Sequence, residues 1–349
     1  MKADDHNSWR GRGGRAACGP GATHLCLPPA ACLHLWPHSA LDPAGPQAGR
    51  ISHVWWVMFV VSVIVFALVI MFLFFAIYRA RRREAPAAEP EARRKMTRAV
   101  VAATVLTTVI LFGLLVDDVI VGRALSSLPA HNDLAIEVVG HQWWWEVRYP
   151  HEDPSQSFTT ANEIHIPVGR SVMLTLTSRD VIHSFWVPNL HGKKDLIPGH
   201  MNTMWVQADS PGVYRGQCAE FCGYQHAHMA LVVVAEPEEQ FDAWYDRQRS
   251  PAVQPTDPQQ ARGQQVFLSS RCVMCHRVVG TPAGSIVGPD LTHVGGRQEI
   301  AAGALPNTRD HLARWVVDSQ EVKPGNRMPP NNFSPEDLDA MLAYLEGLK

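Results

Sequence analysis

The sequence predicts a multidomain protein made of a two-helix transmembrane hairpin, an all-β sandwich and a small all-α domain. Two apolar runs, at residues 54–78 and 99–116, predict the hairpin. Short alternating runs between residues 134 and 237, broken by Gly, Pro, Asn and Asp, predict an antiparallel sandwich or barrel. Helical patterns after a Pro-rich stretch predict the third domain.

These patterns divide the 349 residues into five parts. We expect a leader or disordered segment (1–50), a hairpin (51–122, with helices at 54–78 and 99–121), a sandwich (131–247), a linker (248–260) and a helical domain (261–349). The net charge of −2 gives no electrostatic basis for binding nucleic acid.

The first apolar run, "VWWVMFVVSVIVFALVIMFLFFAIY", holds 25 residues without a charge. A bilayer core of about 30 Å needs about 20 apolar residues in a helix, so this run spans it with some tilt. The alternative is a buried helix of a soluble core, which is rarely apolar on every side. The second run ends at Asp117 and Asp118, which we expect to be a solvated helix end, with an intramembrane proton site as the alternative.

Eight Lys and Arg residues lie between the two runs, at 79–98, and the positive-inside rule places them in the cytoplasm. The N-terminus and everything after about residue 122 then lie on the outer face. Residues 1–50 contain no clear signal peptide. The segment "PPAAC" at 28–32 loosely resembles a lipoprotein cleavage site with Cys32 as the lipid acceptor, and a disordered leader is the alternative.

Four of the seven cysteines form two close pairs, a spacing typical of metal or cofactor binding. The stretch "GQCAEFCGYQHAHMA" combines Cys218 and Cys222 with His226 and Met229. A disulfide would close a very small ring, whereas zinc suits Cys and His ligands. The Met thioether favours copper, and two thiolates can bridge two metals. His183, at the end of a β-like run, can supply a further ligand.

The second cysteine pair lies in "CVMCH", the attachment signal of a c-type haem. Cys272 and Cys275 would form the thioether bonds and His276 would bind the iron. A thioredoxin-like site is disfavoured because no βαβ pattern surrounds the motif, and zinc because no second pair lies nearby. The preceding linker reaches at most about 45 Å, which keeps the haem domain near the sandwich.

The first cysteine motif resembles a known family. The spacing Cys218-x-Glu220-x-Cys222-x-x-x-His226-x-x-Met229, preceded by His183, looks like the dinuclear CuA centre of cytochrome c oxidase subunit II. "GHQWWWE" and "DLIPGH" match further landmarks in the same order, and the resemblance covers about residues 50–245. It implies a cupredoxin-like sandwich behind a two-helix anchor. Cys218 and Cys222 would bridge both coppers, His183 and His226 would each bind one, and Met229 would be a weak ligand.

Glu220 and Trp143 have further roles by this resemblance. The Glu220 carbonyl would complete the copper ligands, and its carboxylate would reach a Mg²⁺ at the interface with subunit I. Trp143 would be the surface aromatic through which electrons reach the copper site. Strand alternation alone puts Trp143 and Trp145 on one face and Trp144 on the other, as in ordinary sandwich packing. His228 lies off the motif and is expected to bind no copper.

One landmark of the family has no match. Many members carry an acidic residue at the start of the second helix, which opens a proton path into subunit I. Here the helix begins "KMTRAVVAATVL", without an acid or a Pro. Glu89 or Glu91 would substitute only if the loop folds back, so the sequence assigns no proton-uptake residue.

The C-terminal part resembles small class I cytochromes c, with "GPDLTHVGGR" and "NRMPP" as companions of the haem motif. The resemblance makes Met328 the distal ligand of the iron, with His293 and His311 as the remaining alternatives. Met341 lies on the apolar face of the last helix and is expected in the core. Ser334 is the expected N-cap of that helix.

The whole pattern resembles subunit II of a caa-type cytochrome c oxidase, with a cytochrome c fused at the C-terminus. The resemblance implies a bacterial inner-membrane protein whose partners are lipid, subunits I and III, and a donor such as a bc complex or a soluble cytochrome c. Oxygen reduction would occur in subunit I. The alternatives are the matching subunit of a CuA-containing nitric oxide reductase, and a free-standing membrane-anchored electron carrier.

Overall fold

The computed structural model of the protein describes residues 38–82, 90–126 and 134–349. The predicted leader up to residue 37, which contains the lipidation candidate Cys32, lies outside these ranges. So does Glu89, one of the two candidate acids before the second helix.

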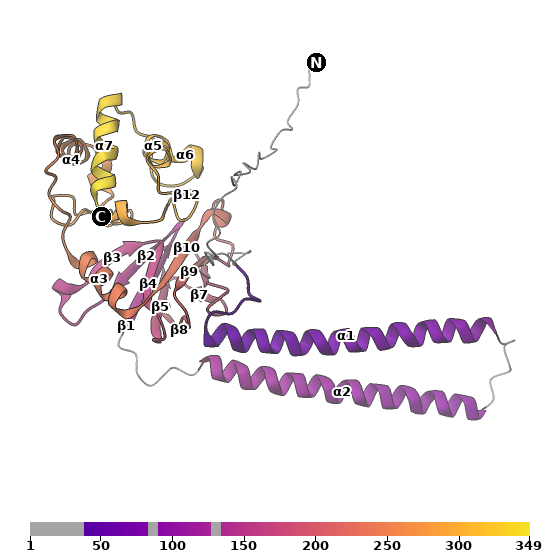
Figure 1. Ribbon diagram of the computed structural model, residues 1–349. Coiled ribbons are helices and arrows are strands. Elements are labelled where there is room, and N and C mark those ends of the chain that lie inside the picture. Colours follow the sequence, from indigo (N-terminus) through magenta and orange to yellow (C-terminus); the bar gives the residue numbers. More distant parts are fainter. Residues whose placement is uncertain (1–37, 83–89, 127–133) are drawn as a thin grey trace, which may run out of the picture. The chain divides into compact units, whose positions relative to one another are not determined.

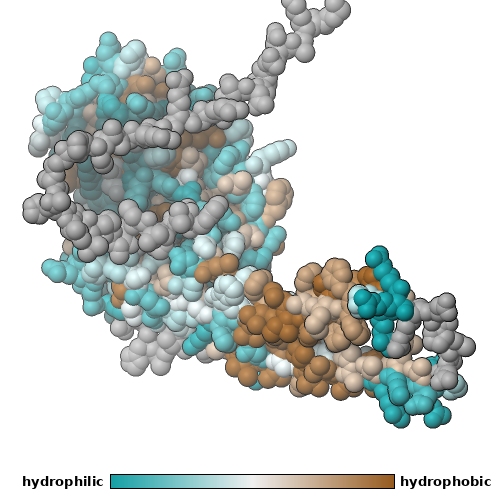
Figure 2. Space-filling view, turned by 45° about the vertical axis from the view of Figure 1, so that its right-hand side comes forward, coloured by the Kyte–Doolittle hydropathy of each residue, from teal (hydrophilic) through white to brown (hydrophobic). Residues whose placement is uncertain are grey.

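Two long helices, α1 (Pro46–Arg81) and α2 (Pro90–Ser126), form the predicted hairpin and lie side by side (Figure 1). Both are long and apolar enough to cross a membrane, with mean hydropathies of 3.2 and 2.6 in their most apolar windows. Figure 2 shows an apolar surface along most of their length. The helices extend beyond the predicted spans because the flanking residues are also helix formers.

The second helix also continues further than predicted. Asp117 and Asp118 lie inside α2, which ends at Ser126 and not at the predicted residue 121. The segment "VIVGRALS" after them contains no Pro, so nothing stops the backbone hydrogen bonds there. At the other end, Glu91 forms an exposed 3.0 Å ion pair with Lys95 one turn later.

The sandwich consists of two five-stranded sheets (Figure 1). The first has the order β3-β2-β1-β5-β8 and the second β4-β10-β9-β6-β7. The strands of the first sheet are β1 (Leu134–His141), β2 (Trp144–Tyr149), β3 (Phe158–Ala161), β5 (Val172–Ser178) and β8 (Asn202–Val206). Those of the second are β4 (Glu163–Pro167), β6 (His183–Trp186), β7 (Lys194–Leu196), β9 (Gly212–Cys218) and β10 (Ala230–Glu236).

The expected antiparallel pairing holds except at one place in each sheet. β1 pairs with β5 in parallel, and β10 pairs with β4 in parallel. In both cases the chain must cross over rather than turn back, so local alternation cannot reveal the direction. The alternation itself is clear in β5, where every second residue is buried.

The sandwich core contains the side chains of Trp145 and Tyr149, both fully buried. α3 (Glu238–Arg249) closes one end by burying Phe241 and Trp244. A backbone hydrogen bond connects the start of the hairpin to the sandwich: the Ala48 amide donates to the Leu190 carbonyl at 3.2 Å.

The C-terminal domain is helical, as predicted. It contains α4 (Pro258–Ser269), α5 (Arg309–Val317), α6 (Ser319–Val322) and α7 (Pro335–Gly347), with a two-stranded ribbon of β11 (Glu299–Ile300) and β12 (Leu305–Pro306). Ser334 caps α7 by accepting a 3.1 Å hydrogen bond from the Asp337 amide. Met341 is fully buried in the core, as expected.

The stretch between the two domains is more structured than the predicted linker at 248–260. α3 occupies its start and α4 begins at Pro258, since Asp257 caps α4 through the amides of Gln259 and Gln260. Between the helices, Ala252 is buried and its amide donates to the Val279 carbonyl at 2.9 Å. The connection is therefore attached to the helical domain and does not act as a free tether along its whole length.

Candidate metal centres

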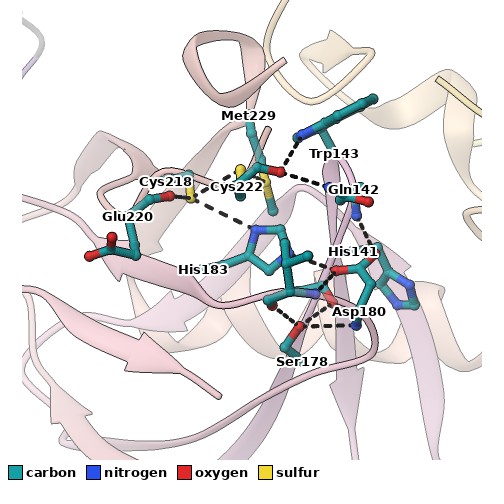
Figure 3. Close-up of polar contacts among 12 residues, drawn as sticks. His141, Gln142, Trp143, Ser178, Asp180, His183, Cys218, Glu220, Cys222 and Met229 are labelled. Atoms are coloured by element: carbon teal, nitrogen blue, oxygen red, sulfur yellow. Dashed lines mark hydrogen bonds and ion pairs between the residues drawn. The ribbon is translucent and has the colours of Figure 1, made fainter. Parts of the chain in front are cut away.

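Two buried cysteines form the centre of the first site. Cys218 ends β9, and Cys222 lies in the loop that leads to β10. Their sulfur atoms are 3.7 Å apart and carry no disulfide. Figure 3 shows both sulfurs facing the same space beside His183.

His183 reaches the sulfurs from the neighbouring strand. β6 pairs with β9 so that Phe185 lies opposite Cys218, which places His183 on the same face two residues earlier. Its Nδ1 is 3.8 Å from the Cys218 sulfur. The ring fits because Gly140 on β1 has no side chain: a Cβ there would lie 2.7 Å from His183 Cδ2. Any larger residue at position 140 would displace the imidazole.

The remaining predicted ligands complete the cluster from the same loop. His226 Nδ1 is 3.6 Å from the Cys222 sulfur, and Met229 Sδ is 3.8 Å from it. The Glu220 carbonyl oxygen is 3.2 Å from the Cys218 sulfur. The structure thus brings all six predicted ligands together. His228 has another contact, since its Nδ1 lies 2.8 Å from the Gln225 side-chain oxygen.

Asp180 holds the imidazole of His183 from the far side (Figure 3). The His183 Nε2 donates to Asp180 Oδ1 at 2.9 Å, which leaves Nδ1 facing the sulfur. Burial lowers the pKa of His183, but the hydrogen bonds to Asp180 and Cys218 outweigh burial and raise it above 6.5. Sequence reasoning missed this residue, although an acid three positions before a candidate ligand is a usable signal.

The electrostatics of the two thiols suit a cation. Their mutual hydrogen bond lowers the pKa of Cys218 and raises that of Cys222, so one thiolate forms readily and the pair shares a proton. A thiolate is the form that binds a metal. The site therefore has the charge, the softness and the burial that copper or zinc requires.

The Glu220 carboxylate points away from the sulfurs in Figure 3. It is 45% exposed and lies 3.9 Å from the Lys193 ammonium. Its carbonyl and its carboxylate therefore face different surroundings, as two separate roles would require.

Trp143 departs from the expectation in two ways. It does not lie in a strand but in the two-residue turn between His141 and Trp144, which are paired in the β1–β2 ladder. It is also not a surface aromatic, since only 7% of it is exposed. The turn brings its indole Nε1 to the Cys222 carbonyl, to which it donates at 3.0 Å. Gln142 Nε2 donates to the same oxygen at 2.8 Å and was not foreseen.

The haem-attachment motif, residues 272–276, begins on a short 3₁₀ turn, Arg271–Met274, and continues past its end. His276 Nδ1 donates to the Pro289 carbonyl at 2.7 Å, and within the described chain its Nε2 has no hydrogen-bond partner. Burial lowers the pKa of His276, which favours the neutral imidazole that binds iron. Met274, Ile286 and Val287 near this motif are at least 63% exposed, and such apolar side chains are what a porphyrin would cover. The residues therefore fit a haem.

The alternatives to Met328 have other partners. His293 is buried and bonds through both ring nitrogens to the carbonyls of Lys349 and Ser250, each at 3.0 Å. His311 Nδ1 contacts the Thr308 hydroxyl at 2.9 Å. The Met328 backbone is fixed by the Asn326 side chain, to which its amide donates at 2.7 Å. Among the described residues, no hydrogen bond engages the Met328 side chain, so Met328 stays the predicted distal ligand.

Two family models match the chain. Residues 151–236 match "Cytochrome C oxidase subunit II, periplasmic domain", and residues 260–349 match "Cytochrome c". These domain families imply copper and haem, in agreement with the grouping of His183, Cys218 and Cys222.

Similar proteins extend the match over most of the chain. Cytochrome c oxidase subunit 2 of Alkalihalophilus pseudofirmus is 38% identical over 89% of this chain and 91% of its own. The same subunit of a Bacillus species, strain PS3, is 34% identical over 69% of this chain and 71% of its own. Among solved structures, the periplasmic domain of subunit II of cytochrome oxidase from Bradyrhizobium japonicum is 30% identical over 35% of this chain and 97% of its own, with a TM-score of 0.33.

Proposed function

This chain belongs to the cytochrome c oxidase subunit 2 family, and we propose that its six clustered ligands hold a dinuclear CuA centre that is reduced by a haem on the same chain. As a subunit of a haem-copper terminal oxidase, it works with other subunits, and the site of oxygen reduction is expected in subunit I. What this chain contributes is the path by which electrons arrive.

The observation that carries the dinuclear assignment is the number and arrangement of ligands. A structural zinc ion takes four ligands in a tetrahedron. Here six candidate ligands surround two sulfurs that are 3.7 Å apart, with one histidine beside each sulfur. Thiolate, thioether and imidazole together are a soft donor set that copper prefers. Two copper ions would use all six candidate ligands, whereas one zinc ion would not.

The protein residues prepare this site for rapid electron relay. Asp180 fixes the His183 ring, and the Cys222 carbonyl accepts hydrogen bonds from Trp143 and Gln142. Both cysteines and Met229 are at most 4% exposed, so water is excluded from the sulfurs. When bound, the copper pair supplies one-electron chemistry. Rigid, dry surroundings keep reorganisation small, which suits relay rather than bond making.

In the helical domain, Cys272, Cys275, His276 and Met328 are the residues that would hold the haem. The Pro289 carbonyl orients the His276 ring through Nδ1. A Met/His axial pair raises the potential of a haem relative to other ligand pairs, as an electron-accepting relay requires. The Glu220 carboxylate would reach a Mg²⁺ shared with subunit I.

The proposal places both domains on the outer face of a bacterial inner membrane. The hairpin supplies two candidate spans, and Arg79, Arg81 and Arg82 at the end of α1 favour a cytoplasmic turn. The expected partners are lipid, subunits I and III, and a donor such as a bc complex or a soluble cytochrome c.

The test is Cys222→Ser in the full chain, produced with its oxidase partners in a host that attaches haem c. We expect the mixed-valence copper signal in the electron paramagnetic resonance spectrum to disappear while the optical haem bands stay unchanged. Cys26→Ser, which changes a cysteine without an assigned role, is the matched control and should leave both signals intact. A single-copper signal or a copper-free wild-type protein would overturn the dinuclear assignment.

A further inference from the structure

A buried lysine joins the helical domain to the sandwich. Lys323, directly after α6, is 2% exposed. Its ammonium donates to the carbonyls of Trp143 at 2.7 Å, His228 at 2.8 Å and Ala301 at 3.1 Å. Three carbonyl acceptors match the three donors of the ammonium. Burial lowers the pKa of Lys323 to about 7, so these three hydrogen bonds belong to its protonated form. Burying an ammonium is costly unless it is hydrogen-bonded in this way, which indicates a built contact.

The loop that follows Lys323 covers Trp143. A Cβ placed on Gly325 would lie 3.9 Å from Trp143 Cη2, so the loop backbone lies against the indole edge. Gly325 has a φ of 85°, a conformation in which glycine is favoured. Next to it, Gln225 Nε2 donates to the Pro324 carbonyl at 2.9 Å. These contacts explain why Trp143 is buried although it lies in a turn.

A second turn of the helical domain contacts the sandwich at the start of β10. Ala301, Ala302 and Gly303 all have positive φ values, between 54° and 76°. This sharp turn lets the Ala302 carbonyl accept a 2.9 Å hydrogen bond from the Ala230 amide. A Cβ on Gly303 would lie only 2.8 Å from the Ala230 Cβ, so the approach requires glycine. Backbone strain of this kind persists only where the surroundings hold it.

An ion pair lies beside this turn. Arg215 on β9 donates through Nη1 to both carboxylate oxygens of Glu299, at 2.5 and 2.6 Å, and through Nη2 to the Gly303 carbonyl at 2.8 Å. The Gln298 amide donates across the same boundary to the Glu163 carboxylate at 3.2 Å. The two side chains of the ion pair are 25% and 30% exposed, so salt screens them only in part.

We propose that Lys323 is a positioning residue which, together with the Arg215–Glu299 pair, holds the haem domain docked over Trp143, so that this face of the copper domain is occupied by the chain's own domain. The electron path that this docking would serve rests on the function proposed above. The docking itself does not. Met328 lies five residues after Lys323 on the same loop, and Trp143 donates to the Cys222 carbonyl (Figure 3). The loop that carries the candidate iron ligand therefore lies against a tryptophan that is hydrogen-bonded to the copper loop.

The docking is tested by hydrogen–deuterium exchange on the full chain in its detergent-solubilised complex. The amides of Ala230 and Gln298 donate across the boundary, one from each domain, so their exchange reports separation. In Lys323→Met we expect both amides to exchange about tenfold faster or more, since a hydrogen-bonded buried charge is lost. Amides inside β5, whose partners lie in the same domain, should not change.

Matched variants separate docking from simple damage to the fold. Arg327→Met removes an exposed charge from the same loop and should leave both amides protected. Arg215→Glu and Glu299→Arg should each speed exchange, and the double variant should restore protection because the pair is re-formed with opposite signs. Unchanged exchange at Ala230 and Gln298 in Lys323→Met would overturn the proposal.

A second measurement distinguishes this inference from the proposed function. The second measurement is the rate of electron transfer from haem to copper after rapid reduction of the haem. In Lys323→Met this rate should fall about tenfold or more, while the copper and haem spectra stay as in the wild type. A missing copper signal in the wild type would defeat the proposed function but leave the exchange result standing. Normal copper and haem spectra with an unchanged transfer rate would reject the positioning role of Lys323 alone.

Discussion

His183 takes its position from residues outside the predicted ligand set. Asp180 accepts the hydrogen of Nε2, and Gly140 leaves the space in which the ring lies. Asp180 also accepts hydrogen bonds from the amides of Gln142 and Val181, at 2.7 and 2.8 Å, so it links the Trp143 turn to the β6 strand. One carboxylate therefore orients a candidate ligand and the turn beside it.

Asp180→Asn should weaken copper binding about 10- to 100-fold, because it removes the charge that supports the His183 imidazole while keeping an acceptor oxygen. The measurement is a copper titration of the full chain against a competing chelator. Asp242→Asn, an exposed position on α3, is the control and should leave the affinity unchanged. Equal affinities for wild type and Asp180→Asn would show that the aspartate does not tune the site.

The candidate ligands were predictable because five of the six lie within twelve residues at fixed spacing, from Cys218 to Met229. His183 was also found, since the family places it on a strand upstream. Asp180, Gln142 and Lys323 act only through the fold, and no spacing in the sequence connects them to the site. The burial of Trp143 was missed for the same reason. It depends on the loop at Lys323, which lies 180 residues later in the chain.

At the scale of elements, the helical domain is built around the crossing of α4 and α7. The two helices approach so closely at Gly263 that a Cβ there would lie 2.0 Å from the Ala340 carbonyl oxygen and 2.7 Å from the Tyr344 Cβ. Phe267 and Tyr344 then meet with ring centroids 5.8 Å apart. The apolar face and the cap of α7 were predictable from its sequence, whereas its partner helix falls partly in the segment assigned to the linker.

Gly263→Ala tests this crossing, because two effects of the substitution change the free energy of unfolding in opposite directions. Helix propensity alone would stabilise the domain by about 1 kcal/mol. A Cβ facing backbone atoms of α7 forces the helices apart, at a cost of about 1–3 kcal/mol or more, and we expect this effect to win. The haem domain should then melt several degrees lower when followed by the haem absorption band. Gly284→Ala, with no atom within 4 Å of the added Cβ, should melt like the wild type. A rise in melting temperature for Gly263→Ala would contradict the packing argument.

For the whole molecule, the arrangement of domains follows from contacts rather than from the connection between them. A flexible linker would hold the haem domain near the copper domain only through effective concentration. Here the connection is partly helical and partly attached through Ala252, and the boundary has its own hydrogen bonds and ion pair. No sequence pattern predicts this boundary, because its side chains bind backbone carbonyls or a residue far along the chain and form no motif.

Lengthening the segment between α3 and α4 distinguishes a haem domain held by its own contacts from one held only by a flexible tether. Eight Gly and Ser residues inserted after Ser250, before the attached Ala252, would double the segment 250–257 that joins α3 and α4. Doubling a flexible tether lowers the effective concentration only about threefold. Because the docked state is held by its own contacts, the haem-to-copper transfer rate should stay as in the wild type, and the Ala230 amide should stay protected. The insertion lies between α3 and Ala252, so the Ala252–Val279 hydrogen bond stays in place and only the stretch before it lengthens. A fall in rate of about threefold, or rapid exchange at Ala230, would mean that the length of the connection sets the arrangement.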